Sequence, residues 1–132
     1  MKLFDIFRKK KSRTDLIFDP VPYGRSTTLE SNRGLLEDPS VSDLETYFDR
    51  MIEDVAEFIT LTPAGSVGGI RYMQACRIPG GIEVELGLEK DGGIRLVGKR
   101  FDEEGARRLF LGFFEGKAVP DTDGFSPVRF DR

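Results

Sequence analysis

Histidine and tryptophan are absent from this chain of 132 residues, and cysteine occurs once, as Cys76. Without histidine there is no Ser-His or Cys-His nucleophile pair, and both the commonest general base and the commonest zinc ligand are missing. A single cysteine forms no intrachain disulfide, and without histidine it makes no structural zinc site. We therefore expect no metal centre, no cofactor and no enzymatic activity.

Long apolar runs are also missing from the chain. No stretch approaches the ~20 apolar residues that a membrane span requires. The short apolar run within residues 3–7 precedes the basic residues, whereas a secretory signal has the opposite order. The length is typical of a single domain. We expect one soluble domain in the cytoplasm.

Charge is distributed unevenly along the sequence. The net charge is −3, but residues 1–13 carry six basic residues and one acidic residue, which leaves −8 for the remainder. A basic arm can contact an anionic surface, yet the acidic body repels nucleic acid, and stable membrane anchoring needs a second signal. The default interpretation is a solvated arm. The candidate residues for binding an anionic surface are Arg8, Lys9, Lys10, Lys11 and Arg13.

The pattern after residue 41 predicts an amphipathic helix over residues 42–60. Ser42 and Glu45 have the spacing of a capping box, and Pro63 with the glycines after it ends the helical pattern. The apolar positions recur at helical spacing along one face. They are Leu44, Tyr47, Phe48, Met51, Ile52, Val55, Phe58 and Ile59.

Three alternating segments follow, at residues 70–78, 82–89 and 94–99, and they predict a sheet of three antiparallel strands. We predict three-residue loops at 79–81 and 90–92, because this register gathers the apolar residues on one face. Cys76 then lies opposite Val84 in the core. Arg77, Glu83 and Lys99 form a row on the opposite, solvated face.

A second helix is predicted from the N-cap Asp102 to Gly116. The expected fold class is therefore α+β, with a three-stranded antiparallel meander, two amphipathic helices on one face and the order α-β-β-β-α. Residues 1–41 are expected to form a basic arm and an extended or loop segment, with a short strand or an extended stretch at 16–18. Residues 42–132 are expected to form the domain, ending in an extended tail anchored by apolar residues.

Three groups of residues invite a chemical interpretation. Ser66 lies between small residues, as in a nucleophile elbow, but a helix precedes it, a strand follows it and histidine is absent, so we interpret it as a connector. Glu83, Glu85 and Glu89 resemble a carboxylate set for acid–base chemistry, but Arg77 and Lys99 favour a salt-bridged solvated face. We interpret Cys76 as a small buried hydrophobe.

The exposed side of the first helix offers the best candidate surface for a partner. Asp49, Glu53 and Glu57 stand four residues apart and form a row of like charges on the predicted helix. Each like-charge pair costs about 0.2–0.5 kcal/mol, so folding gains nothing from the row. A solvated face is the alternative. If the row binds a partner, that partner is a protein with a basic surface.

Two segments, residues 82–87 and 109–116, give the chain a resemblance to the small α+β immunity proteins of bacterial toxin systems. The resemblance implies a non-catalytic protein that binds another protein, and it assigns no functional residue. The alternative hypothesis is a peripheral adaptor whose basic arm docks on an anionic surface. An enzyme that uses only carboxylate, Ser, Tyr and Lys groups comes third. The sequence leaves homo-oligomerisation open.

Overall fold

The computed structural model describes residues 26–116 and 118–128. Along these residues two short strands are followed by a helix, a run of four strands, a second helix and a last short strand. The elements are β1 (Thr28–Ser31), β2 (Gly34–Glu37), α2 (Val41–Ile52), β3 (Phe58–Thr62), β4 (Ile70–Ile78), β5 (Gly81–Lys90), β6 (Gly93–Phe101), α3 (Glu103–Gly116) and β7 (Ser126–Pro127).

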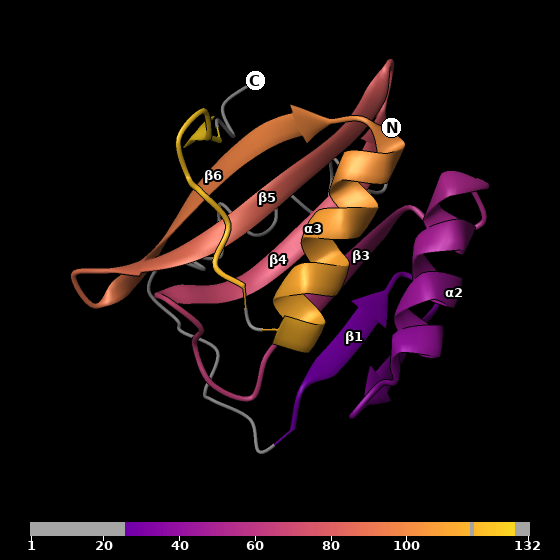
Figure 1. The fold of residues 1–132 in the computed structure, drawn as a ribbon, viewed down its shortest axis with the longest axis horizontal. Coiled ribbons are helices and arrows are strands. Elements are labelled where there is room, and N and C mark those ends of the chain that lie inside the picture. The colour runs from indigo at the N-terminus through magenta and orange to yellow at the C-terminus, as the bar shows by residue number, and fades with distance from the viewer. Residues whose placement is uncertain (1–25, 117, 129–132) are drawn as a thin grey trace.

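All the strands belong to one antiparallel sheet of seven strands, in the order β2-β1-β3-β4-β5-β6-β7 (Figure 1). The predicted three-stranded meander is therefore wrong, although β4, β5 and β6 are the three strands that the alternation indicated. Strands β1 and β2 lie in the segment expected to be an arm and loop, so the sheet begins before residue 42. The strand expected at 16–18 lies outside the described residues.

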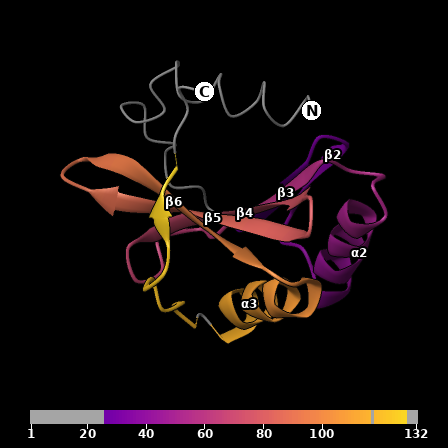
Figure 2. The same cartoon turned by 90° about the horizontal axis from the view of Figure 1, so that it is seen from above.

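Both α2 and α3 cover the same face of the sheet (Figure 2). Beneath them a cross-strand row of buried apolar residues runs through five strands, and it comprises Leu29, Leu61, Met73, Leu86 and Val97. The two helices meet where the Phe48 and Phe110 rings pack edge to face, with centroids 5.9 Å apart. Burying each large apolar side chain contributes about 1.5–3 kcal/mol, so this row and the two rings form the centre of the core.

Helix α2 begins one residue earlier and ends eight residues earlier than the helix predicted over residues 42–60. Ser40 is the N-cap, because its hydroxyl accepts from the Asp43 N–H while the Asp43 carboxylate accepts from the Ser40 N–H. At the other end Asp54 takes a positive φ of 64°, which stops the helix. Residues 58–62 instead form a buried strand beside β1 and β4. A short apolar run of this kind suits either a helix or a strand.

Two-residue turns, rather than three-residue loops, join the three longest strands. Ile78 pairs with Gly81 across the turn residues Pro79 and Gly80, and Gly80 has a φ of 84°. Lys90 pairs with Gly93 across Asp91 and Gly92, which both have positive φ, as a type I′ hairpin turn requires. Each turn is one residue shorter than predicted. A shift of one residue in the pairing of two strands moves every side chain of one strand to the opposite face of the sheet.

The predicted faces are consequently right for β5 and wrong for β4 and β6. Cys76 is buried, as predicted, but it pairs with Glu83 on the face away from the helices rather than with Val84. Arg77 pairs with Ile82 and reaches the end of α2, where its Nη1 donates to the Ile52 carbonyl at 2.7 Å. The predicted row of Arg77, Glu83 and Lys99 does not form.

The second helix agrees with the prediction. Helix α3 spans Glu103–Gly116, and the Asp102 carboxylate accepts from the Gly105 N–H at 2.7 Å, as an N-cap does. The chain then returns along the sheet, where β7 pairs with β6 and the Phe125 ring packs against Phe101. The expected tail anchored by apolar residues is found here.

The register can be tested at Gly87, which pairs with Tyr72. A Cβ at position 87 would lie 2.6 Å from two atoms of the Tyr72 ring. We expect Gly87→Ala to destabilise the fold by about 1–3 kcal/mol in urea unfolding, because the buried ring must move. Gly65→Ala is the control, since no atom lies within 4 Å of its Cβ, and its effect should stay within about 0.5 kcal/mol. Equal losses for the two variants would contradict the register.

Candidate protein-binding surface

The elements at one end of the sheet carry most of the net negative charge of the described residues. Residues 26–57, which contain β1, β2 and α2, hold nine acidic and two basic residues, a net charge of −7. The remaining described residues hold ten acidic and eight basic residues, a net charge of −2. We call residues 26–57 the acidic region. The sheet order places β2 and β1 at one edge, and α2 lies beside them (Figure 2).

The three residues predicted to form a helical row lie on three different kinds of structure. Asp49 is on the exposed side of α2, Glu53 is its C-cap, and Glu57 precedes β3. The helix ends at Ile52, so the expected spacing of four residues along one helix face does not exist. The predicted helical row is therefore wrong, although all three carboxylates belong to the acidic region.

Asp49 is held by an arginine from the neighbouring helix. The Arg107 guanidinium donates to Asp49 Oδ1 at 2.7 Å and to Glu45 Oε1 at 2.9 Å, and it lies 4.7 Å from the centre of the Phe48 ring. One side chain of α3 therefore joins two carboxylates and an aromatic ring of α2. Sequence reasoning missed this contact, which places two of the nine carboxylates in a structural role.

The electrostatics of Arg107 agree with this geometry. Partial burial by itself would lower the pKa of the guanidinium, but the hydrogen bonds and negative charge of Asp49 and Glu45 outweigh burial and raise that pKa. Arg107 therefore stays charged wherever the protein is folded. The stabilising effect of Arg107 on the contact between α2 and α3 requires both carboxylates to carry their charge.

The remaining part of the predicted row lies near the turn between β1 and β2. The Glu57 N–H donates to Asn32 Oδ1 at 2.8 Å, which ties this turn to the chain entering β3. Glu53, Asp54 and Val55 are exposed at the end of α2, and Val55 keeps 45% of its surface accessible. Val55 is an apolar side chain beside two carboxylates that form no ion pair within the described residues. Such a surface suits contact with another protein.

Of the three strand carboxylates, Glu85 does not lie on the solvated, salt-bridged face that the sequence predicted. Glu85 is only 1% exposed, and Gln74 Nε2 donates to its Oε1 at 3.5 Å. Thr60 Oγ1 in turn donates to the side-chain oxygen Oε1 of Gln74 at 2.9 Å. Burial, reinforced by the charge of Glu85, raises the pKa of Tyr72 on the same face. Thr60, Gln74 and Glu85 form a chain of hydrogen bonds across β3, β4 and β5, which we call the buried polar ladder. It favours the pairing of these strands in this register.

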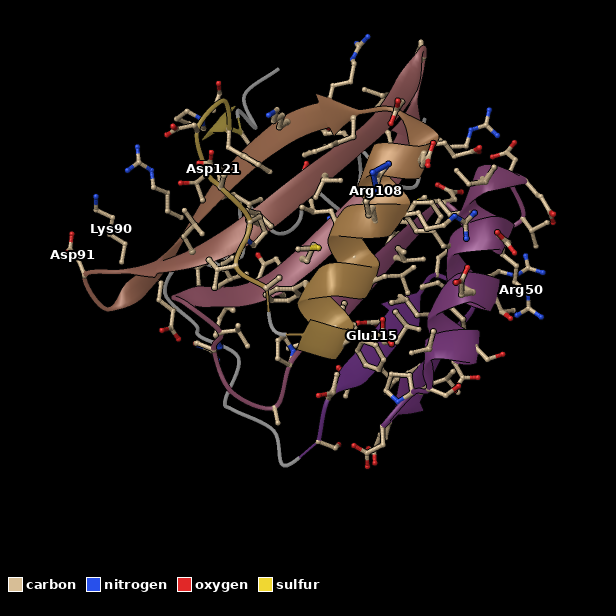
Figure 3. All side chains as sticks on the ribbon, in the orientation of Figure 1. Arg50, Lys90, Asp91, Arg108, Glu115 and Asp121 are labelled. Carbon is tan, nitrogen blue, oxygen red and sulfur yellow. The ribbon has the colours of Figure 1, made fainter. Side chains whose placement is uncertain are left out.

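A shallow hollow of about 300 Å³ lies beside the turn of the β5–β6 hairpin. Arg71 lines it and forms an ion pair with Glu89 at 3.4 Å, and Lys90 and Asp91 add one charge of each sign. Figure 3 shows Lys90 and Asp91 at the tip of this hairpin, away from α2. The lining has no net charge, so the hollow shows no preference for an anion or a cation.

The other residues that the sequence singled out lie outside the acidic region. Ser66 lies in the connection between β3 and β4, so a strand precedes it rather than the predicted helix, and a strand follows it as predicted. The basic residues 8–13 lie outside the described residues. No group of three or more metal-ligating side chains occurs within residues 26–116 and 118–128. No helix in the same part of the chain is long and apolar enough to cross a membrane.

Arg107 and Arg108 provide a matched test of the link between the helices. We expect Arg107→Ala to destabilise the protein by about 1–2 kcal/mol, because two partly exposed ion pairs and one cation–π contact are lost. Within the described part of the chain Arg108 pairs only with Glu104, and both side chains are mostly exposed, at 70% and 82%. Arg108→Ala should therefore cost about 0–0.5 kcal/mol in urea unfolding. A reversed order would show that Arg107 does not link α2 to α3.

Comparison of the chain with protein-family models, with curated proteins and with solved structures finds no match. The resemblance to immunity proteins therefore stays a prediction. Any statement about function has to be supported by the charges, contacts and exposed groups of this chain alone.

Proposed function

We propose that this protein is a non-catalytic protein-binding domain whose acidic region binds a basic surface of another protein. The supporting observation is the segregation of charge, with −7 on residues 26–57 and −2 on the remaining described residues. Charge of one sign gathered on one end of a fold steers an oppositely charged partner and raises the association rate.

The folded structure makes little use of these carboxylates. Of the nine in the acidic region, only Glu45 and Asp49 form an ion pair within the described residues, and Asp43 caps α2. Among residues 26–116 and 118–128 the other six have no basic side chain paired with them, and they repel one another. A partner that brings Lys or Arg side chains would remove that repulsion, and contact with Val55 would add apolar burial.

An immunity-like role is one version of this proposal. A protein that neutralises a cationic toxin would need an acidic surface of this kind, and the resemblance noted in the sequence supports the idea. The same negative charge disfavours nucleic acid and anionic membranes as partners of the acidic region. The alternative of an adaptor that uses residues 8–13 depends on a segment outside the described residues.

Glu53→Lys tests the proposal, with Glu115→Lys as the matched control. Both residues are exposed at the C-terminal end of a helix, but Glu115 belongs to α3, outside the acidic region (Figure 3). In a pull-down from the native host, Glu53→Lys should weaken capture of a basic protein about three- to tenfold at low salt, and less at high salt. Glu115→Lys should capture it like wild type.

Thermal unfolding of both variants supplies the control for folding. Lysine at the C-terminal end of a helix interacts favourably with the helix dipole, so neither variant should lose stability. Equal capture by wild type, Glu53→Lys and Glu115→Lys at both salt concentrations would contradict the proposal. Equal weakening by both variants would point to net charge rather than to the acidic region.

A further inference from the structure

Strand β2 is one edge of the sheet, since its only strand partner among the described residues is β1 (Figure 2). The strand has four residues, and Leu35 within it keeps 57% of its surface exposed. An edge strand presents unpaired backbone groups, which can pair with a strand from another molecule. We call the side of β2 that faces away from β1 the open edge.

The hydrogen bonds of the β1–β2 hairpin show which backbone groups point to the open edge. The Asp38 N–H donates to the Thr27 carbonyl at 2.7 Å, so these two residues form a hydrogen-bonded pair. Hydrogen-bonded pairs alternate along an antiparallel ladder, so Leu36 bonds to β1 as well. Leu35 and Glu37 therefore direct their N–H and C=O groups to the open edge, where a second strand can bond to them.

The opposite edge of the sheet is less suited to such pairing. It is formed by β7, which has only two residues, and Pro127 has no N–H to donate. Proteins commonly block an edge with proline, lysine or a β-bulge. Strand β2 contains no proline or lysine, and its pairing with β1 is continuous from Gly34 to Glu37. Its short length limits the strength of an added strand but does not prevent pairing.

The charge beside the open edge is negative. Glu37 lies on β2, Asp38 follows it and Glu30 lies on β1, and all three side chains are exposed. None of the three forms an ion pair within the described residues. Arg33 lies in the turn before β2, at the other end of the strand from Glu37 and Asp38. The end of the open edge at Glu37 and Asp38 therefore stays negative.

The side chains of β2 have an order that a basic strand can match. Side chains alternate between faces, and Leu36 lies on the face of the helices because its partner Leu29 belongs to the core beneath them. Leu35 and Glu37 therefore share the opposite face, one apolar and one acidic. A strand added antiparallel would set one side chain directly across from each of them. The matching side chains are an apolar one across from Leu35 and lysine or arginine across from Glu37.

We propose that the open edge binds an extended, basic segment of the protein partner, which joins the sheet as a further strand antiparallel to β2. This pairing rests on the proposed function, and it specifies how the acidic region holds its partner. Two residues of the segment, with one residue between them, exchange hydrogen bonds with Leu35 and Glu37. The residue paired with Glu37 is lysine or arginine, and it comes two positions before the apolar residue paired with Leu35.

Charge selects this occupant over the alternatives. A second copy of β2 would bring a second acidic region, with the same charge of −7, against the first. A neutral strand would gain the backbone hydrogen bonds but would leave Glu37 and Asp38 without an opposite charge. A basic strand gains both contributions. The paired stretch is short, so we expect the segment alone to bind with a Kd of about 10 µM to about 1 mM.

A synthetic peptide and residue-resolved hydrogen exchange on the full chain test the pairing directly. The probe is Thr-Thr-Lys-Thr-Val-Thr-Thr, acetylated and amidated, in which Lys pairs with Glu37 and Val with Leu35. At about ten times its Kd the peptide should slow exchange at the Leu35 and Glu37 amides about five- to tenfold. The Leu36 amide should not change, because it already bonds to β1. Unchanged exchange at Leu35 would overturn the pairing.

Methylation of single peptide nitrogens supplies the matched control for backbone pairing. In the bound peptide the Val N–H donates to the Leu35 carbonyl, whereas the N–H of the Thr before it points away from β2. N-methylation at Val should therefore weaken binding about tenfold more than N-methylation at that Thr. Equal affinity of the two methylated peptides would overturn the pairing. Protection of Leu35 that rises with protein concentration in the absence of peptide would also overturn it, and would assign the edge to a second copy.

Glu37→Lys and Glu30→Lys separate contact across the open edge from general negative charge. Both exposed residues lie on the same face and both substitutions change the charge equally, but Glu30 is one strand further from the peptide. Glu37→Lys should weaken peptide binding about three- to tenfold more than Glu30→Lys. Equal effects would overturn the register. If strand pairing failed while Glu53→Lys still weakened capture of a basic protein, the proposed function would stand and the acidic region would hold its partner through side chains alone.

Discussion

Two tight turns, at Pro79-Gly80 and Asp91-Gly92, determine the register of the central strands, and the rest of the fold depends on that register. They bring Met73, Leu86 and Val97 to one face, where α2 and α3 cover them. The same register sends Gln74 and Glu85 to the other face, where they form the buried polar ladder with Thr60. A change of one residue in either turn would exchange the two sets and leave the helices facing polar side chains.

The elements with long, regular patterns could be predicted from the sequence, and their pairing could not. Helix α3, its N-cap Asp102 and the three longest strands were predicted because each has many residues of one period. The register was wrong because the face with Ile70, Tyr72, Cys76 and Ile78 was taken as the only buried face of β4, although both faces of β4 are buried. The dipeptide Asp91-Gly92 is typical of a two-residue hairpin turn, so the sequence did contain a local indication of the correct register.

The errors at the candidate surface share one physical cause. The apolar residues of β3 continue the helical spacing of α2, so the sequence could not show that the chain leaves the helix at Ile52. The row of Asp49, Glu53 and Glu57 depended on that continuation. The excess of acidic residues did not depend on secondary structure, and it is the part of the candidate surface that could be predicted. Strands β1 and β2, with four residues each, are too short to show a period.

The acidic region and the open edge occupy the same part of the fold, and each affects what the other can bind. An exposed edge strand with a leucine at its centre is a general hazard for aggregation, because any extended chain can pair with its backbone. Net negative charge around the edge repels most copies and most acidic chains. Pairing is then favourable only for a protein whose positive charge offsets the repulsion. Charge thus restricts an otherwise unselective backbone surface to a small set of partners.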